Sequence, residues 1–471
     1  MAAVPIESKL TVGDFSGSAA AVHEALVKGG LEPGAAKQKA ALFAEAAAIL
    51  EKSGIEATAT ARGFFVPGRV EVLGKHTDYA GGRSHLMAVS KAFCVVTVDR
   101  DDDQCRFFST HADDQVTLKP SDGIEPIVGH WTNYPATAVK RLTTNFPGDF
   151  LGVDVSFACD IPVASGLSTS SAIICAVWLA LNARNNYSSH PAFKENIMNS
   201  ADLVEFLGCN ENGQSFKGLV GDKGVGTFGG SEDHTAIMTC QKGSISTYSF
   251  CPTVEEAVFP WGDDMAFVIA VSGSIAEKTG DKMQDYNDAA LLAKEAARVY
   301  FAGVKRELPR PHLANAVRDA KGDPDAVRKI IKGHFAAGGT AAFDEAALIR
   351  RFDQFFAESE EIIPAFADAH ARGDWAALGA LVDRSQELTD THLQNQVPET
   401  VFLAKSAREA GAVAASAFGA GFGGSVWACV VTAKTDAFVA EWKAHYTKAY
   451  PAQSAQADFF VEKPGPGAFE L

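Results

Sequence analysis

The sequence predicts a protein of two domains, each of which combines helices with strands. A chain of 471 residues is long enough for two or three domains with substantial cores. Segments that alternate like a half-buried strand, such as 153–157, and segments that are apolar like a buried helix, such as 172–181, occur along the chain. Two prolines and a glycine interrupt the chain between residues 250 and 265, where we place the domain boundary.

Composition and charge exclude several classes of function. The chain is 47% hydrophobic and 21% charged, as is ordinary for a globular protein. Its formal net charge is −16 and it has no basic run, so we expect no nucleic-acid partner. The eight cysteines are scattered singly, and we expect them to be reduced core residues. No stretch reaches the roughly 18 apolar residues that a membrane span needs, and the N-terminus lacks a signal-peptide pattern. We therefore expect a cytoplasmic protein without membrane contact.

The first half of the chain begins with helices and continues with strands. Residues 1–60 are rich in alanine at helical spacing and predict a peripheral helical lead-in. A short strand at 64–66 then runs into a glycine-bracketed loop, 67–82, in which charged and polar groups are crowded. The next predicted elements are a strand at 88–98, an acidic turn at 101–103, a strand that begins at 106 and a helix from 131 to about 142.

The second half carries a cluster of polar groups and then mostly helices. A helix is predicted to end near Glu211, and the glycine-dense segment 218–230 leads to Glu232, Asp233 and His234. Two carboxylates and an imidazole beside a glycine loop predict a functional site. Later elements are a strand at 266–271, helices to about 410, a glycine loop at 418–425, a strand at 426–431, a helix at about 436–446 and a strand at 459–461.

Residues 160–172, DIPVASGLSTSSA, predict an anion site between a strand and an apolar helix. Gly166 allows close backbone approach, and four hydroxyl side chains at 168–171 fall in the first helical turn, where unpaired N–H groups and the helix dipole favour an anion. A serine-capped helix start would explain the same letters. The GxxxxGK[ST] pattern of a P-loop is missing, so a nucleotide site here has another design.

Four segments occur in a characteristic order: PGRVEVLGKHTDYAGG at 67–82, PVASGLSTSSA at 162–172, GGSEDH at 229–234 and FGAGFGGS at 418–425. In this order they resemble the galactokinase branch of the GHMP small-molecule kinases. The resemblance spans about 65–468 and includes WTNY at 131–134 and AEKTGDKMQDYN at 276–287. It implies an α+β fold with a lead-in at 1–60, an N-terminal mixed α/β domain of the ribosomal-protein-S5-like type at 61–258, and a ferredoxin-like C-terminal domain at 259–471.

The resemblance also implies a reaction, in which the γ-phosphoryl group of ATP passes to the anomeric hydroxyl of galactose or a similar sugar. Asp233 falls on the catalytic aspartate and Arg69 on the arginine beside it. Glu211 and Ser170 fall on the Mg²⁺ ligands, with Thr169 as the alternative hydroxyl. The sugar contacts would be Lys75, His76, Asp78, Gly230 and Tyr286. The ATP site would comprise Pro162, Ser165, Gly166, Leu167, Ser168, Thr169, Ser170, Ser171 and Trp131, with the last glycine loop supplying Gly419, Gly421, Gly423 and Gly424. Trp131 could stack on the nucleobase or belong to the core.

The chain departs from the family pattern at four positions: Glu71 replaces Asn, Lys75 replaces Glu, His234 replaces Gln and Ser425 replaces Cys. The glutamate that Lys75 replaces contacts the C6 hydroxyl of the sugar in the family. One hypothesis is therefore a kinase for a C6-altered sugar such as galacturonate or glucuronate. In the alternative, Glu71 and Lys75 pair with each other, and galactose recognition rests on the other contacts.

Two other functions stay open. One is a kinase for a different small alcohol in the same superfamily. The residues at positions typical of the sugar-binding branch argue against this function. The other is a non-catalytic regulator that binds sugar and ATP, against which the intact phosphate loop and Asp233 argue. We expect a sugar, ATP and Mg²⁺ as the ligands, and a monomer.

Overall fold

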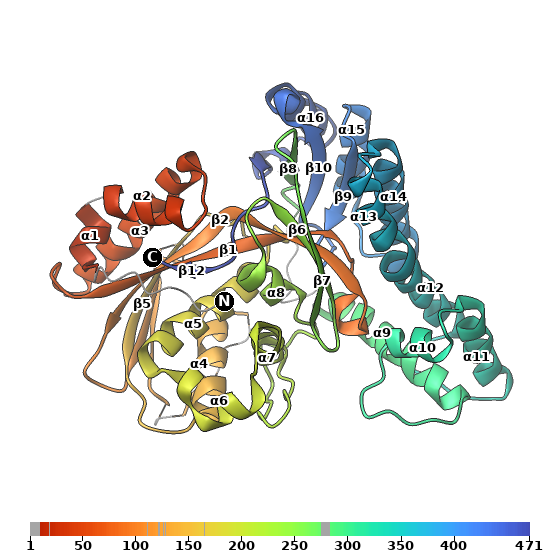
Figure 1. Cartoon of the computed structure of the whole chain (residues 1–471), viewed down its shortest axis with the longest axis horizontal. Helices are drawn as coiled ribbons and strands as arrows, with labels where there is room; N and C mark the ends of the chain where they lie inside the picture. Colours follow the sequence, from red (N-terminus) through yellow and green to blue (C-terminus); the bar gives the residue numbers. More distant parts are fainter. Residues whose placement is uncertain are drawn as a thin grey trace.

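The computed structural model describes residues 10–17, 19–110, 112–120, 123–125, 127, 129–163, 165–274 and 283–471. Within these residues the chain forms two β-sheets with helices packed on them (Figure 1). The first sheet has the strand order β12-β1-β2-β5-β3-β4, and β6 pairs with both β2 and β7. Its strands are β1 Ala61–Leu73, β2 Arg83–Asp99, β3 Cys105–Ser109, β4 Asp114–Leu118, β5 Val153–Cys159, β6 Ser244–Ser249, β7 Val254–Pro260 and β12 Phe469–Glu470.

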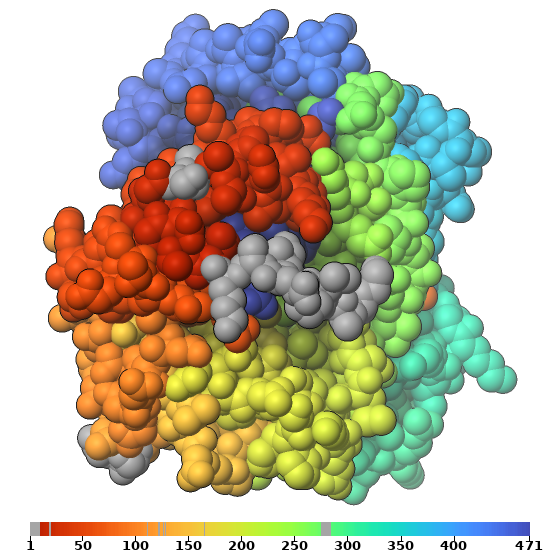
Figure 2. All heavy atoms as spheres, turned by 60° about the vertical axis from the view of Figure 1, so that its left-hand side comes forward, coloured from red at the N-terminus to blue at the C-terminus, as the bar shows by residue number. Residues whose placement is uncertain are grey.

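Helices cover both faces of the first sheet (Figure 1). In the space-filling view the N-terminal helices, in red, lie above the segment of α5 to α7, in yellow (Figure 2). Neighbouring residues of the central strands alternate between two cores: Phe64 packs with one set of helices and Phe65 with the other. One face carries α1 Val12–Gly17, α2 Ala19–Lys28 and α3 Pro33–Lys52. The other face carries α4 Asn133–Asn145, α5 Thr169–Asn185 and α7 Ser200–Asn212, with α6 Pro191–Asn196 and α8 Glu232–Thr239 beside them. The N-terminal helices, predicted as peripheral, are therefore a layer of the sheet, because β1 and β2 are apolar on both sides.

The second sheet has the order β11-β8-β10-β9, and all its strand pairs are antiparallel. Its strands are β8 Met265–Val271, β9 Ala414–Phe418, β10 Ser425–Val431 and β11 Asp458–Glu462. Numbered along the chain, this order is 4-1-3-2, which is the predicted ferredoxin-like arrangement. α15 Pro398–Glu409 and α16 Thr435–Ala449 pack on one face, and α13 Ile363–Ala371 and α14 Trp375–Leu388 on the other.

A helical arm separates β8 from β9. It contains α9 Met283–Gly303, α10 Leu313–Asp319, α11 Pro324–Ala336 and α12 Glu345–Phe356, which enclose their own core. Ala80 of the first glycine loop is part of this core, so the arm is anchored to that loop. A π-helical turn, Ala357–Ile362, joins α12 to α13, and a second one, Thr389–Leu393, follows α14. Such turns are often found at functional sites.

Strand β1 is longer than the sequence predicts. The predicted strand ended near residue 66, yet β1 continues to Leu73 and carries Arg69 and Glu71. The register shifts between Pro67 and Arg69, which marks a bulge. A bulge tolerates a proline, which has no N–H for the ladder, and it frees the N–H of Arg69 to donate to the carbonyl of Leu167 at 3.1 Å.

Candidate active site

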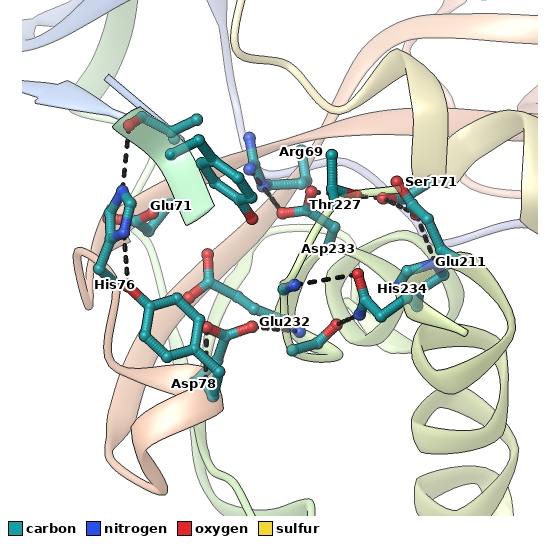
Figure 3. A pocket seen from close by; sticks show the side chains of 17 residues that line it. Arg69, Glu71, His76, Asp78, Ser171, Glu211, Thr227, Glu232, Asp233 and His234 are labelled. Atoms are coloured by element: carbon teal, nitrogen blue, oxygen red, sulfur yellow. Dashed lines mark hydrogen bonds and ion pairs between the residues drawn. The ribbon is translucent and has the colours of Figure 1, made fainter. Parts of the chain in front are cut away.

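A pocket with about 510 Å³ of empty space lies where β1, the first glycine loop, the ends of four helices and the last glycine loop meet (Figure 3). Many residues that the sequence singled out line it: Arg69, His76, Asp78, Glu211, Gly230, Asp233, Tyr286 and Gly419. Glu71, Ser171, Glu232 and His234 also line it. Segments far apart in the chain therefore converge on one site.

Arg69 and Asp233 form the centre of the pocket. Asp233 lies in the first turn of α8, where a carboxylate suits the helix dipole. Nε of Arg69 donates to Oδ1 of Asp233 at 2.7 Å, and Nη2 lies 2.5 Å from the same oxygen. Nη1 donates to the carbonyl of Gly166 in the phosphate loop. Burial lowers the pKa of Arg69, but neighbouring carboxylates, that of Asp233 foremost, raise it overall. The guanidinium stays charged and joins Asp233 to the phosphate loop.

Two serines at the start of α5 contact the same aspartate. Ser168, at the N-cap with a φ of 69°, donates to Oδ2 of Asp233. The Oγ atom of Ser171 lies 3.3 Å from that oxygen and 2.7 Å from Oε2 of Glu211. Ser170, the predicted partner of Glu211, is not among the residues that line the pocket. One step along a helix turns a side chain by about 100°. The hydroxyl beside Glu211 thus belongs to Ser171, and Ser170 as a metal ligand stays a prediction.

His234 contacts the carboxylate of Glu211 from the other side. Its Nε2 lies 2.9 Å from Oε2 of Glu211, the oxygen that Ser171 also contacts. Both side chains are almost fully buried. The histidine that replaces the family's glutamine thus lies against this carboxylate, a contact that the sequence did not indicate.

His76 joins the first glycine loop to the last one. Its Nδ1 lies 2.6 Å from the hydroxyl of Tyr79, and its Nε2 lies 3.0 Å from the carbonyl of Ala420. Its φ is 56°, which is costly for a residue other than glycine. Arg351 of α12 donates to the carbonyl of His76 and so helps to hold this conformation. The imidazole is fixed at the wall of the pocket.

Two glycines allow Asp78 and Tyr286 to face the pocket. A Cβ atom on Gly230 would lie 2.2 Å from Oδ2 of Asp78, and one on Gly229 would lie 3.0 Å from the hydroxyl of Tyr286. Oδ2 of Asp78 accepts a hydrogen bond from the N–H of Glu232 at 3.3 Å. The glycines are therefore required by close approach.

Lys75 does not contact the pocket, contrary to the prediction. Its Nζ donates to Oγ of Ser385 at 2.8 Å and lies 4.0 Å from Oε1 of Glu358. Both partners are fully buried in the C-terminal helices, and Glu358 also accepts from the N–H of Gly74 at 2.8 Å. The change from Glu to Lys is balanced by an internal ion pair, which leaves no amine for a uronate. Lys75 influences Glu71 only through its charge, so the predicted direct pair is not formed either.

Glu71 and Glu232 line the pocket, although neither was assigned a contact with the sugar, ATP or the metal from the sequence. Both side chains are buried. Burial raises the pKa of Glu71 to about 7 and that of Glu232 well above its usual value. The two-residue step from Arg69 to Glu71 on one strand was the signal that could have placed Glu71. It was missed because this stretch was interpreted as a loop.

The last glycine loop packs against the phosphate loop. Ser425 donates to the carbonyl of Ser165 at 2.6 Å, and a Cβ atom on Gly419 would lie 3.0 Å from the carbonyl of Gly166. A Cβ atom on Gly421 would lie 2.4 Å from Nδ2 of Asn395. All four predicted glycines of the loop, Gly419, Gly421, Gly423 and Gly424, have positive φ. The close contact between the two loops depends on these small residues.

Trp131 lies away from the pocket, at the head of α4. Its Nε1 donates to Oδ2 of Asp114 at 3.0 Å, and the ring packs against the main core. Stacking on a nucleobase remains a prediction. Three parts of the predicted pattern lie outside the described residues: residues 1–9, residue 164 of the phosphate loop and residues 276–282.

Known protein families match three segments of the chain, which contain Arg69, the phosphate loop and the last glycine loop. The galactokinase galactose-binding signature matches residues 55–97, and the N- and C-terminal domains of GHMP kinases match residues 133–208 and 363–448. The chain belongs to the galactokinase family. One curated relative in this family is a galactokinase of Actinobacillus pleuropneumoniae serotype 5b (strain L20), with 26% identity over 381 residues. The match covers 79% of this chain and 86% of the relative.

Solved structures place this galactokinase-family chain in the GHMP kinase fold. The galactokinase of Lactococcus lactis, solved with galactose, matches with a TM-score of 0.73 and 21% identity over 92% of this chain and 100% of its own. The Lin0012 protein of Listeria innocua matches with a TM-score of 0.55 and 14% identity over 88% and 99% of the two chains. The predicted two-domain fold is thus confirmed. Within the described residues, no helix is long and apolar enough to cross a membrane.

The cysteines of this galactokinase-family chain are all free thiols. Five of them are buried, as the sequence predicts. Cys251 is exposed, contrary to the prediction, since it lies beyond the end of β6 at the surface.

Proposed function

We propose that this protein is an ATP-dependent sugar 1-kinase that transfers the γ-phosphoryl group of ATP to the anomeric hydroxyl of galactose. The observation that carries the proposal is the Arg69–Asp233 pair, which lies between the phosphate loop and the first glycine loop. Phosphoryl transfer requires an aligned hydroxyl, a carboxylate near its proton and cations on the phosphate oxygens. In the pocket, Asp233 would align the sugar hydroxyl and lie near its proton. The guanidinium of Arg69 would supply positive charge to the phosphate oxygens.

In the proposed reaction Asp233 accepts a hydrogen bond from the sugar hydroxyl and receives its proton as the new P–O bond forms and the bond between the γ-phosphorus and the departing ADP breaks. Arg69 stabilises the negative charge on the transferred group and holds the carboxyl group of Asp233 in position. Its contact with Gly166 ties this carboxylate to the phosphate loop at a fixed position. Catalysis is then mostly positioning and electrostatics.

Magnesium fits the oxygen donors at the start of α5. The carboxylate of Glu211 and the hydroxyl of Ser171 are 2.7 Å apart in the same pocket. Magnesium prefers oxygen ligands and is usually held by one or two carboxylates together with substrate phosphates. Glu211 and Ser171 would hold the ion, which neutralises phosphate charge when bound. Ser170 and Thr169 are the neighbouring candidates.

We assign ATP to the loop from Pro162 to Ser171 and the sugar to the opposite wall. The loop ends at the N-terminus of α5, where free N–H groups favour phosphate. His76, Asp78 and Tyr286 present directional polar groups to the sugar, and Gly230 makes room for them. Lys75 has no place in this assignment, and the uronate alternative loses its basis with it.

The function is tested by measuring ADP release with Mg·ATP across galactose, galacturonate, glucuronate, N-acetylgalactosamine, arabinose and fucose. We expect turnover with galactose. A protein that binds ATP but turns over none of these sugars would be a regulator, and the kinase assignment would fail. We further infer a monomer in the cytoplasm, and light scattering after size-exclusion chromatography tests the oligomeric state.

A further inference from the structure

Glu71 presents a buried carboxyl group to the pocket. It follows Arg69 by two positions on β1 without a register shift between them, and both residues line the pocket (Figure 3). The side chain of Glu71 is 3% exposed. Within the described residues, its Oε1 has no hydrogen-bond partner. A buried carboxylate oxygen without a donor is costly, so this atom is suited to accept a hydrogen bond from a ligand.

Glu232 supports Glu71 from the first residue of α8. Both carboxyl groups are buried and line the pocket, and the charge of Glu71 raises the pKa of Glu232. Ser84 donates to Oε2 of Glu232 at 2.6 Å and so fixes this carboxyl group from behind. Burial raises the pKa of Glu71 to about 7, against the opposing charges of Lys75 and Arg69. The pair therefore provides a hydrogen-bond acceptor, Oε1 of Glu71, and no positive charge.

The charge around the pair is unsuited to an anionic sugar. Among the pocket-lining residues that the structure describes, five have carboxyl groups and one, Arg69, has a guanidinium. That guanidinium is already bound by Asp233 and by the carbonyl of Gly166. A carboxylate on the sugar would meet acceptors and like charge, whereas a hydroxyl or an ammonium group would meet acceptors that it can satisfy.

We propose that Glu71, supported by Glu232, is a sugar-binding residue that accepts a hydrogen bond from the ring. The pair makes the pocket accept a hydroxyl or a protonated amine and reject a carboxylate. The proposal rests on the sugar-kinase function above and deepens it by naming the class of sugar. Selectivity for the sugar then depends on Glu71, two residues after Arg69 on β1, and not on Lys75.

The test is equilibrium binding by calorimetry in the presence of Mg²⁺ and a non-hydrolysable ATP analogue. The ligands are galactose, 2-amino-2-deoxygalactose, 6-amino-6-deoxygalactose and galacturonate. For the wild type we expect at least one amine to bind as tightly as galactose, and galacturonate to bind at least tenfold more weakly. Glu71→Gln should weaken galactose binding roughly tenfold, as expected for one charge-assisted hydrogen bond. It should also reduce the discrimination between the amine and galacturonate.

Glu462→Gln is the matched control. Glu462 on β11 is also 3% exposed, burial also raises its pKa to about 7, and it does not line the pocket. This variant should bind all four sugars like the wild type. The melting temperature of Glu71→Gln separates binding from structure, because removal of a buried, poorly solvated carboxyl group should leave it unchanged or higher. Glu232→Gln provides a second variant that should weaken galactose binding in the same way.

The outcomes separate the two proposals. A wild type that binds no galactose overturns the sugar-kinase function itself. If the wild type binds galactose but Glu71→Gln binds it equally well, the function stands and the role of Glu71 is overturned. Equal binding of galactose and galacturonate, or both amines weaker than galactose, overturns the selectivity. Weaker binding with a lower melting temperature assigns Glu71 a structural role and also overturns the proposal.

Discussion

Replacement of Lys75 tests whether this residue serves the fold or the substrate. In the structure its amine has two partners, Ser385 and Glu358, and the ion-pair distance to Glu358 is 4.0 Å. Lysine and glutamate are 1% and 0% exposed, so water cannot replace the lost partner. Lys75→Met leaves Glu358 as a buried charge without its cation, which costs about 3–5 kcal/mol when one partner of a buried pair is removed.

Urea unfolding at pH 7 measures this cost. Lys75→Met should lower the free energy of unfolding by about 3–5 kcal/mol, and the double variant with Glu358→Gln should recover most of the loss. Lys405→Met is the control, because its ion pair with Glu409 has a similar distance of 3.9 Å but is exposed. That variant should change stability by less than about 1 kcal/mol. A stable Lys75→Met protein with an altered sugar preference would refute the structural role.

Three further predictions concern the metal, the sugar and pH. Ser171→Ala should raise the Mg²⁺ concentration for half-maximal rate about tenfold, and Ser170→Ala should not change it. Titration of the rate with Mg²⁺ measures both values. A rise in Ser170→Ala alone would identify Ser170 as the ligand. Gly230→Ala should raise the KM for galactose at least tenfold in steady-state kinetics, because the new Cβ atom would lie 2.2 Å from Oδ2 of Asp78. Burial lowers the pKa of His85 from 6.5 to about 4, so its contribution is complete above pH 6.5 and lost as pH falls to 4. Urea unfolding at pH 7 and pH 4.5 should show this loss, up to about 3 kcal/mol, and it should shrink in His85→Gln; equal losses would place the effect elsewhere.

The phosphate loop and its helix could be predicted from local letters. Small residues, hydroxyls and a buried helix follow one another within 160–172, and α5 begins at Thr169 as that pattern indicates. Three strands of the second sheet, β8, β10 and β11, were predicted for the same reason, because each is a short apolar run between turns, whereas β9 was not predicted. Their order in the sheet came from the resemblance, since pairing between distant strands leaves no local signal.

The partners of the first glycine loop could not be predicted. Lys75 contacts Glu358 and Ser385, and His76 contacts Ala420, all of which lie far along the chain. The sequence of a motif is the same whether its charged side chain faces a ligand or a buried partner. The helix register places Ser171 beside Glu211, and a run of hydroxyl residues does not reveal that register in the sequence. The sequence thus predicted where the site lies, while long-range contacts decided which side chains enter it.

The most direct test of the account is the chemical identity of the product. Wild-type protein with Mg·ATP and galactose should form galactose 1-phosphate, whose anomeric phosphate phosphorus NMR identifies. Asp233→Asn should abolish this product while ATP binding is retained, because the carboxylate that receives the hydroxyl proton is lost. Phosphate on another hydroxyl, or undiminished formation of galactose 1-phosphate by the variant, would contradict the central role of the Arg69–Asp233 pair.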